Sequence, residues 1–238
     1  MKYLSEKSTW FNPSIEYLFN SIIYEYDIKN AGFSIIKAYN LLTDQEIRQL
    51  NQMEKKQQII EIGKKMGQNR EFSENLTRQF GEIRKFFIDS NYITDNDLIA
   101  VKKDALFCTK ECRNLNFGGI EFRVKNQYSS YIRFPYNNNL EIYYNDGGKI
   151  DVKGISEINL NKHRLFMLEF IKKIINYLED KNLFIKRYFK KFVDSYRFLE
   201  LENEFYLEFN NLSNQINPLF NYQNVIIPFA QIITKEIH

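Results

Sequence analysis

Two aspartates, Asp27 and Asp104, are the residues of this sequence best suited to chemistry. Each is expected at the end or the turn of a strand, among apolar neighbours. A carboxylate in such surroundings is costly unless it is paired, hydrogen-bonded or bound to a metal. On strands of one sheet the two acids could converge on divalent cations, and two Mg²⁺ ions promote phosphoryl transfer by activating a hydroxyl and stabilising the leaving oxygen. The plainer alternative is that both aspartates only cap turns.

The composition narrows the classes of protein to consider. The chain has 238 residues, 44% of them hydrophobic and 26% charged, which is typical of a folded globular protein. It has no apolar run long enough to cross a bilayer and no signal-peptide core, so we expect a soluble, cytoplasmic protein with no membrane partner. Two cysteines and two histidines disfavour a disulfide framework, a His-ligated zinc site and a Ser-His-Asp hydrolase.

Basic residues concentrate in one stretch of the chain. Residues 162–197 hold ten Lys or Arg and four Asp or Glu, a net charge of +6, whereas the whole chain carries +3. Because aromatic residues are interleaved with these charges, the stretch is typical of a surface that faces a polyanion. The alternative is an ordinary solvated helix face with aromatic residues packed into a core.

The first half of the chain predicts one strand and several helices. Alternating bulky residues from Ile22 predict a strand that ends near Asp27, and residues 33–42 predict a short helix. Thr43 and Glu46 fit a capping box that opens a polar helix towards Lys65. Gly67-Gln68-Asn69 ends this helix and residues 73–91 form a second one, so residues 42–91 are expected to be a helical hairpin.

The second half predicts hairpins and then helices. Residues 98–108 read as a hairpin around Lys102-Lys103-Asp104, and Gly118-Gly119 is a turn former. The stretch 145–148, Asn-Asp-Gly-Gly, is a strong hairpin signal between two further strands. From residue 161 the pattern is helical. Strands and helices segregated in this way predict an α+β protein with lobes.

Several motifs resemble those of the B-family (α-like) DNA polymerases. The segment from Asp27 to Ile36 resembles the first palm motif, D-x-x-S-L-Y-P-S-I-I, with matches at the aspartate and at Ser-Ile-Ile. Lys103-Asp-Ala-Leu-Phe107 resembles the second half of the Y-G-D-T-D-S-L-F hairpin, so that Asp104 falls on the second metal-binding aspartate and Lys102 replaces the first. Lys125–Tyr128 is similar to the family's K-x-Y element, and residues 149–155 resemble its D-x-K-G segment.

The resemblance implies a reduced polymerase core. Residues 1–41 and 92–160 would form a palm sheet, residues 42–91 a short helical fingers hairpin, and residues 161–238 a helical thumb with a C-terminal tail. The chain has no room for an exonuclease domain, so proofreading is not expected. The implied reaction is template-directed nucleotidyl transfer during DNA replication, with a primer–template and a nucleoside triphosphate as partners and with two Mg²⁺ or Mn²⁺ ions.

The resemblance also assigns roles to individual residues. Asp27 and Asp104 would be catalytic and, with the Ile28 carbonyl, would bind the metal ions. Gly32 takes the place of the tyrosine that excludes ribonucleotides, so tolerance of ribonucleotides is expected. The candidates for gripping the triphosphate are Lys55, Lys56, Lys64, Lys65 and Arg70. The candidates for contact with nucleic acid are Lys103, Lys125, Tyr128, Lys153, Lys186, Arg187 and Lys190.

A second hypothesis belongs to a different class of protein. The chain could be a non-catalytic or split-polymerase subunit that binds nucleic acid within a replication or transcription complex, encoded by a virus or plasmid in a host cell. Lys102 and the short fingers favour this alternative, whereas the retention of Asp27 and Asp104 favours the enzyme. A third reading, a viral protein that binds a host factor, has no positive support in the sequence.

Overall fold

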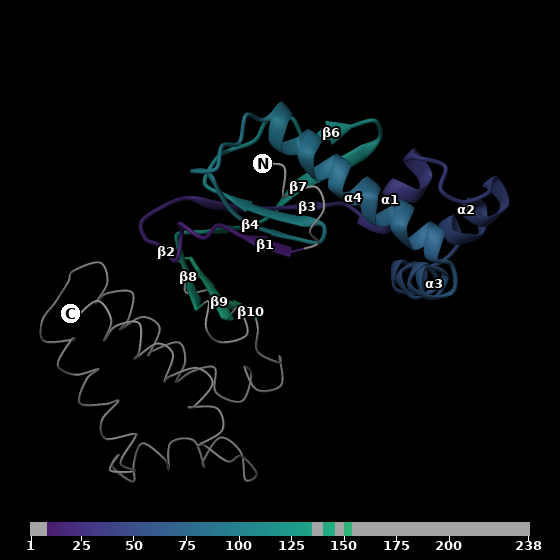
Figure 1. The fold of residues 1–238 in the computed structure, drawn as a ribbon, viewed down its shortest axis with the longest axis horizontal. Helices are drawn as coiled ribbons and strands as arrows, with labels where there is room; N and C mark the ends of the chain where they lie inside the picture. Colours follow the sequence, from purple (N-terminus) through teal and green to yellow (C-terminus); the bar gives the residue numbers. More distant parts are fainter. Residues whose placement is uncertain (1–8, 135–139, 146–149, 154–238) are drawn as a thin grey trace, which may run out of the picture. The chain divides into compact units, whose positions relative to one another are not determined.

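The computed structural model describes residues 9–134, 140–145 and 150–153 of the chain (Figure 1). The chain divides into two compact units, residues 1–15 with 21–128 and residues 16–20 with 129–238. Each unit contains an antiparallel sheet, and the described part of the first unit contains the helices α1 to α4, so the expected α+β class is confirmed. In chain order the described elements are β1 (Thr9–Phe11), β2 (Tyr17–Leu18), β3 (Ile23–Ile28), α1 (Ala31–Ala38), α2 (Asp44–Asn51), α3 (Lys55–Gln68), α4 (Arg70–Ser90), β4 (Leu98–Lys102), β5 (Ala105–Cys108), β6 (Asn116–Phe117), β7 (Ile120–Tyr128), β8 (Ser130–Phe134), β9 (Leu140–Tyr144) and β10 (Ile150–Lys153).

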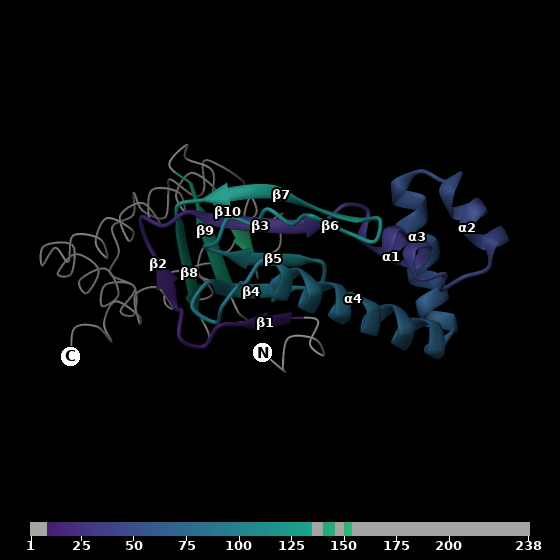
Figure 2. The ribbon, with the colours of Figure 1, turned by 90° about the horizontal axis from the view of Figure 1, so that it is seen from above.

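The sheet of the first unit is built around β3. Its strand order is β1-β4-β5-β3-β7-β6, and every neighbouring pair is antiparallel. Figure 2 shows the strands side by side, with α1, α2 and α3 beyond the end of the sheet at which β3 ends. The C-terminal end of β3 therefore leads directly into the helical part of this unit.

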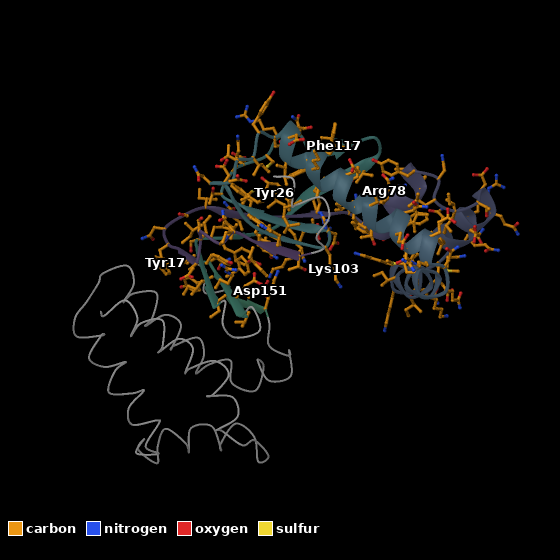
Figure 3. All side chains as sticks on the ribbon, viewed as in Figure 1. Tyr17, Tyr26, Arg78, Lys103, Phe117 and Asp151 are labelled. Atoms are coloured by element: carbon orange, nitrogen blue, oxygen red, sulfur yellow. The ribbon has the colours of Figure 1, made fainter. Side chains whose placement is uncertain are left out.

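Helix α4 covers one face of this sheet. Its buried residues Leu76, Ile83 and Phe87 recur at helical spacing, which gives the helix an apolar side. The ring of Tyr26 on β3 lies 5.3 Å from that of Phe87, and Phe122 on β7 stacks on Phe87 at 4.1 Å. These rings form the core between helix and sheet, with Tyr26 on the helix side (Figure 3).

The polar helix expected to run from the capping box towards Lys65 is instead two helices, α2 and α3. Helix α2 ends at Asn51 and α3 begins at Lys55. Between them the side-chain amide of Gln58 donates hydrogen bonds to the carbonyl oxygens of Leu50 (2.9 Å) and Met53 (3.2 Å). This buried side chain satisfies carbonyl groups that the end of α2 leaves open. No glycine or proline marks the break, which is why the sequence pattern did not reveal it.

The capping box and the interruption near Asn69 are confirmed, but α4 begins at Arg70, three residues before the predicted start at residue 73. Thr43 and Glu46 form the capping box, with the Thr43 N–H donating to the Glu46 carboxylate at 2.9 Å and the Glu46 N–H donating to the Thr43 hydroxyl at 3.4 Å. Asn69 separates α3 from α4, and its side chain accepts a hydrogen bond from the Phe72 N–H at 3.0 Å. No helix among the described residues is long and apolar enough to cross a membrane.

The hairpin expected over residues 98–108 is present, and the turn former Gly118-Gly119 lies in a second hairpin. β4 and β5 are joined by Lys103 and Asp104, and Lys103 has a φ of 48°. β6 and β7 are joined by Gly118 and Gly119, with φ of 58° and 87°. Positive φ is favourable for glycine and strained for lysine, so the β4–β5 turn needs support from its surroundings.

The second unit contains an antiparallel sheet of order β10-β9-β8-β2. Ile132, Ile142 and Val152 lie opposite one another across β8, β9 and β10, and all three are buried. The strands on either side of the expected turn at residues 145–148 are therefore confirmed, while residues 146–148 of the turn lie outside the described residues. The expected helices of residues 161–238 also lie outside them.

Candidate functional site

Strand pairing brings the two predicted aspartates together. β3 and β5 are antiparallel neighbours, with Asp27 opposite Ala105, the residue after Asp104. The N–H of Ile28 donates a hydrogen bond to the carbonyl oxygen of Asp104 at 3.3 Å. The backbones of the two acids therefore lie at the same end of the sheet. It is the end of β3 that leads into α1 (Figure 2), and Lys103 of the β4–β5 turn is labelled in Figure 3.

The charged side chains lie on the face of the sheet that α4 does not cover. Lys102, Ala105, Asp27 and Arg123 are opposite one another across β4, β5, β3 and β7. Opposed residues of antiparallel strands project to the same face, and neighbouring residues along a strand project to opposite faces. Because Tyr26 faces α4, the row that contains Asp27 faces the other way.

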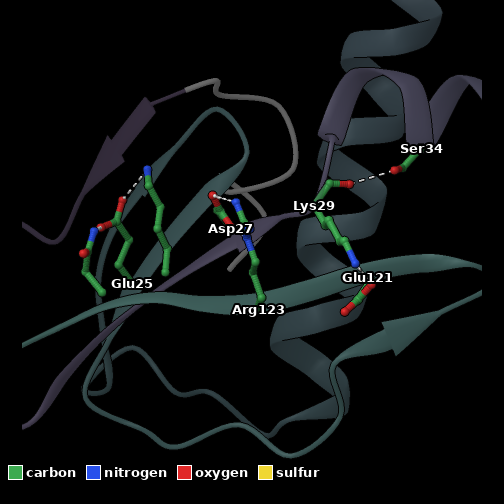
Figure 4. Close-up of polar contacts among 8 residues, drawn as sticks. Glu25, Asp27, Lys29, Ser34, Glu121 and Arg123 are labelled. Carbon is green, nitrogen blue, oxygen red and sulfur yellow. Dashed lines mark hydrogen bonds and ion pairs between the residues drawn. The ribbon is translucent and has the colours of Figure 1, made fainter. Parts of the chain in front are cut away.

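Asp27 forms an ion pair with Arg123 (Figure 4). Nε of the guanidinium lies 2.9 Å from Oδ1 of Asp27, and Nη2 lies 3.5 Å from Oδ2. The Asp27 side chain is only 11% exposed, whereas that of Arg123 is 48% exposed. The carboxylate raises the pKa of Arg123 above its ordinary value by hydrogen bonding and by charge. A nearly buried acid is thus capped from the solvent side by a cation.

A second acid, Glu25, lies on the same face of β3 and is 1% exposed. Its carboxylate accepts hydrogen bonds from Lys125 Nζ (3.2 Å), Asn126 Nδ2 (2.6 Å) and the Tyr128 hydroxyl (3.0 Å). The register between β3 and β7 shifts between Glu25 and Tyr26, which leaves Lys125 as the extra residue of a β-bulge. A bulge redirects side chains, and this one gives Glu25 two neighbouring donors from one strand.

The Lys125 ammonium interacts electrostatically with Glu25, Asp27 and Asp104. Burial lowers the pKa of the Lys125 ammonium, but the charges of Glu25, Asp27 and Asp104 and the hydrogen bond to Glu25 outweigh burial and raise it overall. The charges of three carboxylates, from β3 and the β4–β5 turn, therefore act on one ammonium group.

Arg84 on α4 supports the turn that carries Asp104. It is 2% exposed and donates a hydrogen bond to the carbonyl oxygen of Lys103, the residue with positive φ. Burial lowers the pKa of Arg84, and the charge of Asp104 partly offsets this. On the neighbouring strand the Lys102 ammonium lies over the rings of Phe11 (5.5 Å) and Phe107 (5.4 Å). Lys102 is thus held by aromatic side chains.

The residues fit a divalent metal ion by donor type. Carboxylate oxygens are the ligands that Mg²⁺ and Mn²⁺ prefer, and Asp27 and Asp104 supply them at one end of the sheet. Within the described ranges no group of three or more His, Cys, Asp or Glu is arranged to hold a metal ion, so the site depends on this pair. A metal ion at Asp27 would have to replace the guanidinium of Arg123 as its counter-ion.

The residues predicted to bind the triphosphate lie on or next to the helices at the same end of the sheet. Gly32 is on α1, and a Cβ added to it would lie 3.4 Å from Cδ1 of Ile62 on α3, so Ile62 lines this position. Lys55 and Lys56 are exposed in the first turn of α3. Lys64, Lys65 and Arg70 form ion pairs with Glu61 (2.6 Å), Glu46 (2.6 Å) and Glu74 (2.7 Å).

The residues predicted to contact nucleic acid differ in their surroundings. Lys103 is exposed at its turn and Lys125 is half-exposed, whereas Tyr128 is 2% exposed and bonds Glu25, so it lies in the interior. In the second unit Lys153 pairs with Asp151 at 3.6 Å and lies 5.3 Å from the centre of the Tyr143 ring. Lys186, Arg187 and Lys190 lie outside the described residues.

Sequence reasoning missed Glu25, Arg84 and Arg123. Glu25 had a usable signal, since it precedes Asp27 by two positions in an apolar strand and therefore shares its face. Arg123 and Lys125 alternate in the same way on β7. Arg84 had no such signal, because an arginine between the apolar residues of an amphipathic helix is ordinarily exposed.

The fold and the site define an α+β protein whose central antiparallel sheet holds a pair of carboxylates, Asp27 and Asp104, among basic side chains. The chain belongs to the family described as bacteriophage PBS1 gene 130 protein, whose family model matches residues 1–226. No curated protein matches the sequence. The family's description names a bacteriophage, which agrees with the viral alternative of the expected virus- or plasmid-encoded protein.

Proposed function

We propose that the protein catalyses template-directed nucleotidyl transfer, with the sheet of the first unit acting as a polymerase-type palm. One observation carries the proposal: Asp27, at the end of β3, and Asp104, at the adjoining β4–β5 turn, come from distant parts of the chain and meet at one end of the sheet. Helix α4 backs the sheet, and the row that contains Asp27 lies on the other face.

The site residues would have different roles in such a reaction. Asp27 and Asp104, with the carbonyl of Ile28, would hold two Mg²⁺ or Mn²⁺ ions, which supply activation of a primer hydroxyl and neutralisation of the departing pyrophosphate. Arg84 fixes the backbone of the turn that carries Asp104. Arg123 and Lys125 place positive charge beside the acids, where it favours binding of phosphate groups.

The substrates are a primer–template and a nucleoside triphosphate. Lys55 and Lys56, exposed on α3 beyond the end of the sheet, are available to the triphosphate, and the surface ion pairs of Lys64 and Arg70 are weak enough to be exchanged for it. Lys103, exposed beside Asp104, would contact the nucleic-acid backbone. Tyr128 would act indirectly, by holding Glu25 and thereby Lys125.

Extension of a primed template in Mg²⁺ or Mn²⁺ tests the proposal. Wild type should extend the primer, and Asp27→Asn and Asp104→Asn should each lose most of the rate, because positioning and charge neutralisation are nearly all that the protein contributes. The Lys29→Gln variant is the matched control, since it removes an exposed ion pair between Glu121 on β7 and Lys29, the residue after β3. Equal extension by all variants would reject the carboxylates as the catalytic pair.

A specific observation favours a second candidate function. Arg123 and Lys125 already neutralise Asp27 and Glu25, as expected of a palm-like subunit that binds nucleic acid within a replication or transcription complex without catalysis. Such a protein would bind a primed template with steep salt dependence, would extend nothing, and would bind equally well as Asp27→Asn. Binding and extension measured on the same preparations separate the two functions.

A further inference from the structure

The ion pair between Asp27 and Arg123 joins a nearly buried carboxylate to a half-exposed arginine. Nε and Nη2 of Arg123 face both carboxylate oxygens, at 2.9 and 3.5 Å, and the carboxylate has little other access to solvent because its side chain is 11% exposed. The arginine is 48% exposed, so its guanidinium can leave towards solvent without disturbing the core. The acid is fixed in the sheet and the cation is on a long, half-exposed side chain.

A neighbouring ion pair, between the residue after β3 and a residue of β7, makes a useful comparison. Lys29 and Glu121 are 3.1 Å apart, with both side chains more than half exposed. Two residues from Asp27, this pair carries the same kind of charges without enclosing a buried acid (Figure 4). Of these two pairs, the Arg123 pair is the one that covers a carboxylate of the candidate site.

We infer that Arg123 is a displaceable counter-ion that excludes a free divalent cation from Asp27 and yields the carboxylate when a metal–polyphosphate complex arrives. This rests on the proposed function. The guanidinium has five N–H donors in a planar fork that matches phosphate as well as carboxylate oxygens, so a polyphosphate can take it over. A bare cation offers the guanidinium no new partner and meets electrostatic repulsion. The ligand class is a divalent metal complex of a nucleoside triphosphate.

Binding of Mn²⁺, followed by the loss of the electron paramagnetic resonance signal of the free ion, tests the inference without relying on activity. Arg123→Gln should bind Mn²⁺ alone more tightly than wild type by about tenfold or more, because a like charge beside the metal ligand is removed. With dATP present the order should reverse, since the variant has lost a phosphate ligand. Lys29→Gln removes one positive charge two residues from Asp27. Its affinity for Mn²⁺, alone and with dATP, should stay within about twofold of wild type.

The double variant Arg123→Gln/Asp27→Asn distinguishes failure of this inference from failure of the proposed function. If the gain in Mn²⁺ affinity disappears in the double variant, Asp27 is the ligand that Arg123 blocks and the inference is supported. If Arg123→Gln binds Mn²⁺ no more tightly than wild type while Asp27→Asn weakens Mn²⁺–dATP binding, the inference is rejected and the carboxylate site stands. If Asp27→Asn changes no binding in any background, both are rejected. Thermal unfolding of each variant confirms that it is folded.

Discussion

Replacing the buried Glu25 by alanine tests whether the network beside Asp27 stabilises the sheet. The carboxylate is 1% exposed and accepts hydrogen bonds from Lys125, Asn126 and Tyr128. Without it the Tyr128 hydroxyl, in a side chain that is 2% exposed, loses a buried acceptor, at a cost of about 1–3 kcal/mol. Lys125 is half-exposed and can turn to water, so its loss is smaller.

The expected loss in the free energy of unfolding is therefore about 2–4 kcal/mol, a large part of the roughly 5–15 kcal/mol that stabilises a typical domain. Urea unfolding followed by tryptophan fluorescence measures it. The chain has one tryptophan, Trp10, which lies on β1 and packs against the core of the first unit, so the signal reports on the unit that carries the site.

Glu121→Ala is the matched control for Glu25→Ala. Glu121 lies on β7 and pairs with Lys29 at 3.1 Å, but its side chain is 51% exposed. Exposed pairs contribute about 0–1 kcal/mol, so this variant should remain close to wild type. Glu25→Gln retains an acceptor of similar shape and should fall between the two. A Glu25→Ala loss no larger than that of Glu121→Ala would refute the reasoning.

Further tests concern stability, sugar selection and salt. The hydrogen bond from Lys65 lowers the pKa of Glu46 from 4.5 to about 2, so its contribution is present above pH 4.5 and is lost as the pH falls towards 2. Glu46→Gln should therefore be less stable than wild type by about 1 kcal/mol at pH 7, with the difference vanishing near pH 2 in acid-unfolding curves. Gly119→Ala, at a φ of 87°, should cost about 1–2 kcal/mol in urea unfolding, whereas Gly63→Ala, with nothing within 4 Å of its added Cβ on α3, should be neutral or stabilising. Since Gly32 offers no side chain to block a 2′-hydroxyl, ribonucleotides should be incorporated in primer extension, and their strong exclusion would contradict its assigned role. Affinity for a primed template should fall steeply between low and high salt, and a slope near zero would argue against phosphate contacts.

Local sequence signals predicted much of the first unit. The alternation in β3, the Gly118-Gly119 turn and the Thr43–Glu46 capping box each act within a few residues, and the structure has all three. The break between α2 and α3 depends instead on Gln58, which reaches back to carbonyl groups of another helix. Such a contact exists only after the helices have packed, so no local sequence pattern predicts it.

In the candidate site, too, some residues could be predicted from local sequence and others depend on how the strands pair. Asp27 and Asp104 could be singled out because each is an acid at the end of an apolar strand. The partners of these acids could not, since Arg123 faces Asp27 only through the register of β7 against β3. That register includes a bulge after Glu25, and shifting it by one residue would reverse the faces of every following side chain.

Anomalous diffraction from crystals grown with Mn²⁺ and a non-hydrolysable nucleoside triphosphate tests the central claim most directly. The proposed function predicts a manganese peak within bonding distance of carboxylate oxygens of both Asp27 and Asp104, with the guanidinium of Arg123 turned from Asp27 to a phosphate. Nucleotide bound without a manganese peak at these two carboxylates, and with Arg123 still paired to Asp27, would contradict it.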